Sequence, residues 1–195
     1  MMEKEVTAII LAGGKSSRMK QDKGLAFFRD RKMVECVLEK VRKVTDSILI
    51  ISNNPAYEQF GVPVFPDEIK DCGPIGGIYT GLLHSQSQKN LVLSCDIPFV
   101  TEAALSLLIG ETGAEDALVF THEGKAEPLC AVYDARCEEI FLRLIETGAF
   151  KMMDALEHLD TRKISWPVEA SALKNIFTNI NTPEDLELYQ SSNEN

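Results

Sequence analysis

Residues 11–25 are the stretch of sequence whose residue types most clearly suggest a chemical role. They read LAGGKSSRMKQDKGL and combine two adjacent glycines with several cationic side chains. Glycine lets a ligand approach the backbone closely, and the backbone N–H groups of such a bend can bind an anion. The side chains of Arg18 and Lys23 add positive charge that can follow phosphate oxygens during a reaction. The segment predicts binding of a nucleoside triphosphate whose pyrophosphate must leave. A purely structural bend at Gly13 and Gly14 is the alternative.

The positions of these glycines exclude the two best-known phosphate-binding loops. A P-loop has a glycine five residues before the second one, and Ile9 occupies that position within an apolar run. The dinucleotide fingerprint G-x-G-x-x-G fails as well, because Gly13 and Gly14 are adjacent and no third glycine follows at the required step. The segment therefore belongs to another class of phosphate-binding turn.

Two carboxylates follow apolar runs elsewhere in the chain. Asp96 ends the run NLVLSCD, and Pro98 prevents that strand from continuing. Ligands of open α/β sheets bind beyond the carboxyl ends of strands, and Mg²⁺ commonly takes one or two carboxylates together with phosphate oxygens. Asp96 is therefore a magnesium candidate, with helix capping as the alternative. Asp67 follows the short run VPVF and could reach the same cleft, or it could simply be a turn residue.

Composition restricts the class of protein. The chain has 195 residues, of which 45% are hydrophobic and 26% charged, as expected for one globular domain over 1–195. A formal net charge of −10 argues against nucleic acid as a partner. The basic residues nevertheless gather early in the chain, and a local basic patch on an acidic protein suits a small anion. They are Lys15, Arg18, Lys20, Lys23, Arg29, Arg31 and Lys32.

The five cysteines are odd in number and form no C-x-x-C pair, so neither a zinc site nor a disulfide framework is expected. A reducing compartment is the simplest interpretation. The first residues lack a secretory layout, and no apolar run is long enough to span a bilayer. The sequence therefore predicts a cytoplasmic protein without a membrane partner.

Apolar, β-branched runs alternate with amphipathic segments along the chain. Strands are predicted at 6–10, 47–52, 62–67, 90–96, 117–122 and 128–134. Helices are predicted at 33–44, 73–85, 136–148 and 151–159, with two more that begin after Thr101 and at Pro183. Thr182 is expected to cap the last of these helices, and residues 190–195 are expected to fray.

This alternation predicts an α/β fold, a single Rossmann-like domain in which a mostly parallel sheet carries helices on both faces. The two runs near residues 117–134 flank the polar stretch EGKAE and resemble a hairpin. They predict one antiparallel strand, and hence a mixed sheet. We find no repeats, low-complexity tracts or linkers that would divide the chain.

The segment 11–25 resembles the nucleotidyltransferase pattern L-A-G-G-x-S-x-R-M-G-x-D-K. Three later stretches, DCGPIGGIYTGL, CDIPF and NINTPEDL, are similar in order to blocks of the MobA-like branch, the molybdenum cofactor guanylyltransferases. The matched blocks extend from Leu11 to about Leu186. Lys20 departs from the pattern, which has glycine there. A lysine would be strained by about 1 kcal/mol or more if that position needs a positive φ.

The resemblance implies roles for individual residues. It places Leu11, Ala12 and Gly13 against the guanine nucleotide. Lys23 would contact its phosphates with help from Arg18, Asp67 would bind nucleotide, and Asp96 would bind both GTP and Mg²⁺. Asn53 would also contact nucleotide, although Ser52 or Asn54 could be the equivalent residue. Asn179 and Asn181 would lie near the reacting phosphates, on the acceptor side.

The implied reaction is transfer of GMP from GTP to the terminal phosphate of molybdopterin, with release of pyrophosphate. Molybdoenzyme apoproteins or other cofactor-assembly proteins are further partners that the resemblance suggests. A CTP-dependent cytidylyltransferase or another small-molecule nucleotidyltransferase is the first alternative. A non-catalytic molybdopterin carrier is an alternative of another class, since its basic loop would grip phosphate without any use for Asp96 and Mg²⁺.

Overall fold

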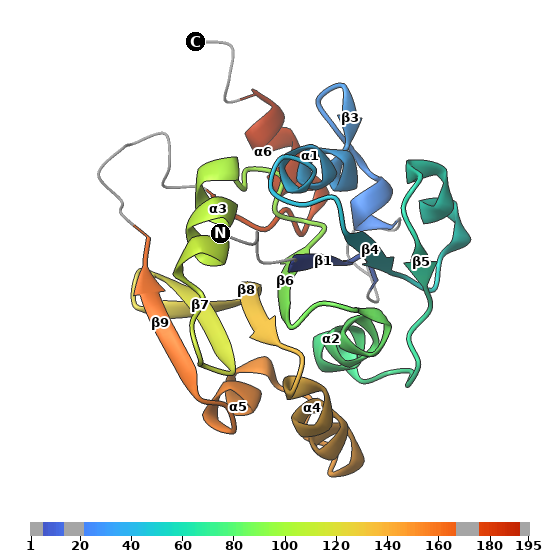
Figure 1. The fold of residues 1–195 in the computed structure, drawn as a ribbon. Helices are drawn as coiled ribbons and strands as arrows, with labels where there is room; N and C mark the ends of the chain where they lie inside the picture. Colours follow the sequence, from blue (N-terminus) through green and yellow to red (C-terminus); the bar gives the residue numbers. More distant parts are fainter. Residues whose placement is uncertain (1–5, 14–21, 167–175, 192–195) are drawn as a thin grey trace.

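A seven-stranded sheet forms the centre of the computed structural model, which describes residues 6–13, 22–166 and 176–191 (Figure 1). The strand order is β5-β4-β1-β6-β8-β7-β9. In chain order the strands are β1 Val6–Leu11, β4 Ile48–Ile51, β5 Val64–Phe65, β6 Lys89–Ser94, β7 Ala117–His122, β8 Lys125–Asp134 and β9 Thr161–Ser165.

Strand β8 runs antiparallel to both of its neighbours, β6 and β7, whereas the other paired strands of this sheet are parallel. The predicted mixed and mostly parallel sheet is therefore confirmed. The sequence did not predict β9, which pairs in parallel with β7 at the edge of the sheet. Its sequence, TRKIS, is polar and only partly buried, so it lacks the apolar pattern by which the other strands were found.

Helices cover both faces of the sheet, as Figure 1 shows. Helices α1 (Met33–Val41), α3 (Glu102–Glu111) and α6 (Pro183–Ser191) lie on one side, and α2 (Gly73–His84), α4 (Cys137–Glu146) and α5 (Met152–Glu157) lie on the other. Each face has its own apolar core. Val37 and Leu38 of α1 pack in the first core, and Ile78 of α2 and Phe141 of α4 pack in the second.

The helix boundaries follow from local sequence signals. Thr101 accepts a hydrogen bond from the Ala104 N–H and begins α3, as predicted. Thr182 likewise accepts from the Asp185 N–H at 3.1 Å, which confirms the predicted cap of α6. Helix α1 ends at Val41, three residues before its predicted end. Helix α6 extends to Ser191. The expected fraying of residues 190–195 stays a prediction, since residues 192–195 lie outside the described residues.

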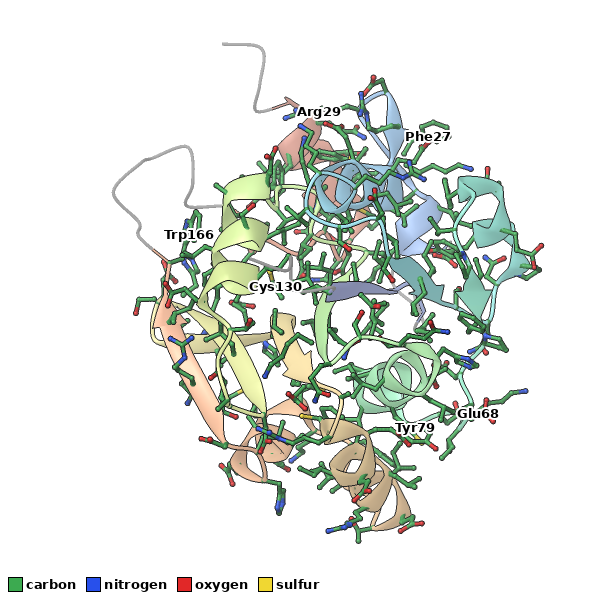
Figure 2. The ribbon with its side chains drawn as sticks, viewed as in Figure 1. Phe27, Arg29, Glu68, Tyr79, Cys130 and Trp166 are labelled. Atoms are coloured by element: carbon green, nitrogen blue, oxygen red, sulfur yellow. The ribbon has the colours of Figure 1, made fainter. Side chains whose placement is uncertain are left out.

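Four short elements escaped prediction because each is too brief for a periodic pattern. They are the 3₁₀ helices η1 (Lys23–Leu25) and η2 (Pro55–Phe60) and the paired strands β2 (Phe27–Phe28) and β3 (Arg31–Lys32). Figure 2 shows Phe27 and Arg29 in this small hairpin, at the end of the molecule where α1 and α6 lie. The 3₁₀ helix η1 carries a predicted site residue, Lys23.

The polar connection between β7 and β8 is shorter than predicted. Only Glu123 and Gly124 form the turn, with φ of 49° and 77°, and strand β8 already begins at Lys125. Positive φ at both central residues is the requirement of the two-residue hairpin turn that matches strand twist. The segment EGKAE is therefore mostly strand. Because β8 is antiparallel to β6 and β7, its first residues lie beside the C-terminal ends of those two strands.

All five cysteines are buried and free. Cys130 lies inside the molecule, near the centre of Figure 2. Burial raises the pKa of its thiol well above the usual value. A buried protonated thiol packs as a small apolar side chain. Among the helices of the described residues, none is long and apolar enough to cross a membrane.

Candidate active site

The candidate site lies at the carboxyl ends of the central strands. Leu11, the last residue of β1, pairs with Ile51 of β4 on one side and with Ser94 of β6 on the other, so the three strands end level. After β1 the chain forms β4 and then β5 on one side of β1, and it returns to form β6 on the other side. Such a reversal of strand order is where open α/β sheets bind ligands.

A cavity of about 730 Å³ opens at this point, and five predicted nucleotide contacts line it together: Leu11, Ala12, Gly13, Asn53 and Asp67. The Ala12 N–H donates to the Ile51 carbonyl at 2.9 Å, and the Leu11 carbonyl accepts from the Cys95 N–H at 3.1 Å. The backbone therefore stays in the sheet through Ala12 and leaves it at Gly13. Among the described atoms, none lies within 4 Å of where a Gly13 Cβ would be.

The start of helix α2 forms one wall of the cavity through Gly73, Pro74 and Gly77. A Cβ on Gly77 would lie 3.1 Å from Leu11 Cδ2, so glycine lets the helix approach strand β1 closely. Asp71 precedes the helix with a φ of 62°, an uncommon conformation for a residue other than glycine. The N-terminal end of a helix carries partial positive charge, and the Lys70 side chain beside it adds a full one.

Asn53 and Asp67 form a reciprocal pair on the β4–β5 side of the cavity. Asn53 Nδ2 donates to Asp67 Oδ2 at 2.7 Å, and the Asp67 N–H donates back to Asn53 Oδ1 at 3.1 Å. The two other candidates, Ser52 and Asn54, also line the cavity. Ser52 is buried and accepts from the Asn54 N–H, while Asn54 caps η2. Asn53 is the exposed member of the three, and its nucleotide contact stays a prediction.

A second group of predicted residues meets just beyond the cavity wall. Lys23 Nζ donates to Asn181 Oδ1 at 2.5 Å and lies 3.6 Å from Asp96 Oδ2. Ser94, which lines the cavity, donates from its hydroxyl to Asp96 Oδ1 at 2.5 Å. The Ile180 N–H donates to the Asp96 carbonyl, which attaches the late segment to the end of β6. The structure thus brings Lys23, Asp96 and Asn181 together, whereas Asn179 is exposed two residues away.

Asp96 caps no described helix, because Thr101 is the cap of the helix that follows. Its side chain is 14% exposed and already faces a lysine. Within residues 6–13, 22–166 and 176–191, no three His, Cys, Asp or Glu side chains gather as a protein-only metal site would require. A single strand-end carboxylate does suit Mg²⁺, which keeps several waters and takes phosphate oxygens from a substrate. The described residues therefore fit a metal that arrives with a triphosphate.

Asp22, Gly24 and Tyr57 also belong to the site, although sequence reasoning gave them no role. Asp22 lines the cavity, and its Oδ1 accepts from the Tyr57 hydroxyl at 2.5 Å and from the Gly24 N–H at 3.2 Å. Its Oδ2 accepts from Asn54 Nδ2 at 3.0 Å. The D-K-G spacing around Lys23 was a signal that could have been used, whereas nothing in the sequence pointed to Tyr57.

Burial and negative neighbours keep two further groups neutral beside the site. Burial, with the nearby Cys95 and Asp22, holds the pKa of the Tyr57 hydroxyl far above its usual range. Burial also raises the pKa of the Cys95 thiol, and the adjacent Asp96 adds to that shift. Neither group is therefore an anionic nucleophile at neutral pH. Gly14, Arg18 and Lys20 of the predicted phosphate-binding segment lie outside the described residues.

Comparisons with known proteins identify the family. Residues 8–161 match the family described as the MobA-like NTP transferase domain. A probable molybdenum cofactor guanylyltransferase of Flavobacterium johnsoniae is 36% identical over 93% of this chain and 94% of that protein. A molybdenum cofactor guanylyltransferase of Vibrio campbellii is 32% identical over 91% of each chain.

Solved structures show the same architecture. The molybdopterin-guanine dinucleotide biosynthesis protein A of Archaeoglobus fulgidus superposes with a TM-score of 0.79 and 27% identity, over 94% of this chain and 96% of that one. A putative protein of Aquifex aeolicus also superposes with a TM-score of 0.79, at 26% identity over 93% and 96% of the two chains.

Proposed function

The chain belongs to the MobA-like NTP transferase family, and from this premise we propose that it transfers GMP from GTP to the terminal phosphate of molybdopterin. Relatives that match over nine-tenths of the chain carry the name molybdenum cofactor guanylyltransferase, which supports this choice of reactants. The structural observation that carries the proposal is the meeting of Lys23, Asp96 and Asn181 beside a cavity at the ends of β1, β4 and β6.

In the proposed reaction an oxygen of the molybdopterin phosphate forms a bond to the α-phosphorus of GTP. The bond from that phosphorus to the α–β bridging oxygen breaks, and its electron pair leaves with pyrophosphate. A phosphate monoester is already largely ionised at neutral pH, so the attacking oxygen needs no strong general base. The remaining catalytic work is positioning and stabilisation of negative charge.

Each predicted site residue is assigned one part of this positioning and charge stabilisation. Lys23 supplies a cation for the departing pyrophosphate, and Asn181 fixes its ammonium group through the 2.5 Å hydrogen bond. Arg18 is proposed to assist from the same segment. Asp96 would hold Mg²⁺, and a bound Mg²⁺ would offset the charge of the phosphate oxygens. Asn179, exposed near Asn181, is proposed to face the acceptor.

The nucleoside would occupy the β4–β5 side of the cavity. Guanine presents an amino and an imino donor, which suit a carboxylate or a backbone carbonyl. Asp67, held in place by Asn53, offers a carboxylate on that side, and the backbone from Leu11 to Gly13 offers carbonyl groups. Asn53 is proposed to contact the nucleotide through the same exposed surface.

Pyrophosphate release in the presence of molybdopterin, Mg²⁺ and each nucleoside triphosphate in turn tests the choice of reactants. We expect release with GTP and little with CTP, ATP or UTP. Selective release with CTP would replace this proposal by the cytidylyltransferase alternative. Release with GTP and a sugar phosphate, but not with molybdopterin, would point to another small-molecule nucleotidyltransferase.

The carrier alternative is tested by Asp96→Asn, because a carrier has no use for a magnesium ligand. We expect this variant to bind molybdopterin as the wild type does and to lose pyrophosphate release. Asp30→Asn is the matched control, since Asp30 is an exposed aspartate in the β2–β3 hairpin that pairs with Arg31. Molybdopterin binding by the wild type without any GTP turnover would favour the carrier.

A cytoplasmic location is part of the proposal, and the five free cysteines support it because disulfides are rare in reducing compartments. Docking onto molybdoenzyme apoproteins or other cofactor-assembly proteins is likewise proposed from the family resemblance. Copurification of this chain with such apoproteins from a cytoplasmic fraction would test both.

A further inference from the structure

The carboxylate of Asp22 joins two elements of the site, η1 and η2 with its N-cap residue. Tyr57 on η2 donates its hydroxyl to Asp22 Oδ1 at 2.5 Å, and the same oxygen accepts from the Gly24 N–H at 3.2 Å. The other oxygen accepts from Asn54 Nδ2 at 3.0 Å. Tyr57 is fully buried, so its hydrogen bond is shielded from competing water.

Gly24 is seated between the same tyrosine and the end of strand β6. A Cβ at Gly24 would lie 2.3 Å from the Tyr57 hydroxyl oxygen and 2.9 Å from Cys95 Sγ, closer than real contacts allow. Cys95 directly precedes Asp96 in the chain. The backbone on the C-terminal side of Lys23 is therefore packed against Cys95, which links the end of β6 to Asp96.

Both chain neighbours of Lys23, Asp22 and Gly24, are therefore fixed in place. The Lys23 ammonium group itself contacts Asn181 and Asp96. A lysine side chain has much rotamer freedom, so a fixed backbone reduces the number of positions that its ammonium group can reach. We propose that Asp22 and Tyr57 are positioning residues, which fix the backbone that carries Lys23 so that its ammonium group stays beside Asp96. The inference rests on the proposed function, because it concerns Lys23 at the phosphates of GTP.

The donor in this arrangement is stable toward pH. Burial, Cys95 and Asp22 together raise the pKa of Tyr57 far above its usual value, so the hydroxyl keeps its proton throughout the physiological range. The arrangement also crosses the cavity, because Asn54 on the nucleoside side and Lys23 on the phosphate side are joined through Asp22. The Tyr57 hydroxyl is buried and bonded to Asp22, the chain neighbour of Lys23, so we expect its effect on the reaction to pass through Lys23.

Tyr57→Phe tests this inference, because it removes one hydroxyl from a buried ring of nearly unchanged volume. Tyr133→Phe is the matched control: Tyr133 is also fully buried, and its hydroxyl donates at 2.8 Å to the Pro128 carbonyl, within β8. We expect both variants to lose a similar amount of thermal stability. Only Tyr57→Phe should lower kcat for GTP-dependent pyrophosphate release, by about ten-fold, with the KM for molybdopterin unchanged.

The same two substitutions in a Lys23→Ala background separate positioning from a general structural effect. If Tyr57 acts through Lys23, Tyr57→Phe should change the residual activity less than two-fold in that background. An equal loss of kcat with and without Lys23, or an equal loss in Tyr133→Phe, would overturn the inference.

Wild-type turnover distinguishes failure of this inference from failure of the proposed function. If the wild type releases no pyrophosphate, the proposed function fails, and the same variants are compared by calorimetric titration with GTP and Mg²⁺. Positioning then predicts weaker GTP binding in Tyr57→Phe only when Lys23 is present. A Tyr57→Phe effect on GTP affinity that is independent of Lys23, or no effect at all, would contradict it.

Discussion

Lys23 Nζ lies 2.5 Å from Asn181 Oδ1, although 158 positions separate these residues in the chain. The contact joins the first segment of the site to the last, and the Ile180 N–H fixes the late segment to the Asp96 carbonyl. Asp185 Oδ2 in turn accepts from the N–H groups of Asn181 and Thr182, so the first turn of α6 orders the loop that carries the amide. The α6 helix therefore contributes to the site through its N-terminal turn.

Substitution of Lys23 by alanine should lower kcat/KM for GTP by roughly 10²-fold, since one charged donor to the phosphates is lost. Steady-state pyrophosphate release over a range of GTP concentrations measures this. Lys43→Ala is the matched control, because Lys43 is a half-exposed lysine whose Nζ pairs with Glu102 at 3.6 Å. An unchanged kcat/KM in Lys23→Ala would remove Lys23 from the phosphate-binding role.

The Asn53–Asp67 pair gives a prediction for the nucleoside side of the cavity. Asp67→Asn removes the charge that Asn53 holds in place, so GTP should bind about ten-fold more weakly. Calorimetric titration with GTP and Mg²⁺ measures the Kd. Glu68→Gln is the control, since this exposed neighbour, labelled in Figure 2, does not line the cavity. Equal affinities for GTP in wild type and Asp67→Asn would place the guanosine elsewhere.

Much of the fold could be predicted because its central strands are apolar on both faces. The runs that became β1, β4 and β6 are bounded by polar or glycine residues, and their burial in a parallel sheet matches that pattern. Strand β9 escaped because Ile164 is its single apolar residue, so the segment has no apolar pattern that would indicate a strand. Its pairing with β7 is a tertiary contact, which local sequence does not encode.

The site divides in a similar way. Residues within one motif, such as Gly13 and Lys23, could be singled out from type and spacing. Asn181 was placed near the phosphates through the family resemblance. Tyr57 could not be found, because it follows an ordinary turn and reaches the site only when η2 packs beside η1. Site residues that lie close together in one motif can be predicted from the sequence. A residue that reaches the site through a hydrogen bond between distant elements can be found only once the fold is known.

The buried end of β8 predicts sensitivity to acid. Burial alone would raise the pKa of Asp134, but hydrogen bonds from Lys89, the Arg136 N–H and Gln88 outweigh it and hold that pKa below its usual value. Lys89 Nζ lies 2.9 Å from Asp134 Oδ2, and the carboxylate side chain is only 4% exposed. The folded state thus binds the proton less tightly than the unfolded state does.

Because the folded pKa is the lower one, this stabilisation is fully present above the unfolded value of about 4. It should be lost as the pH falls through the folded pKa. We expect the free energy of unfolding in urea to decline below pH 4, and to decline less steeply in Asp134→Asn. Asp30→Asn, whose aspartate is exposed to screening solvent, should keep the wild-type profile. An identical slope in wild type and Asp134→Asn would show that other groups dominate acid unfolding.

Gly81 and Gly110 form a matched pair that tests why α2 approaches the sheet so closely. A Cβ at Gly81 would lie 2.4 Å from Ile9 Cγ2, and Ile9 is fully buried in β1, so it has little room to move. Gly81→Ala should therefore lower the free energy of unfolding by about 1–3 kcal/mol through overpacking. At Gly110 in α3 no described atom lies within 4 Å of the added methyl group.

Gly110→Ala should consequently leave stability unchanged or raise it by up to about 1 kcal/mol, because alanine favours helix. Urea unfolding of both variants at pH 7 measures the difference. Since α2 also forms a wall of the cavity, displacement of this helix by Gly81→Ala should weaken GTP binding as well, whereas Gly110→Ala should not. Equal stabilities of the two variants would mean that α2 can shift away from β1 at little cost, contrary to the close packing at Ile9.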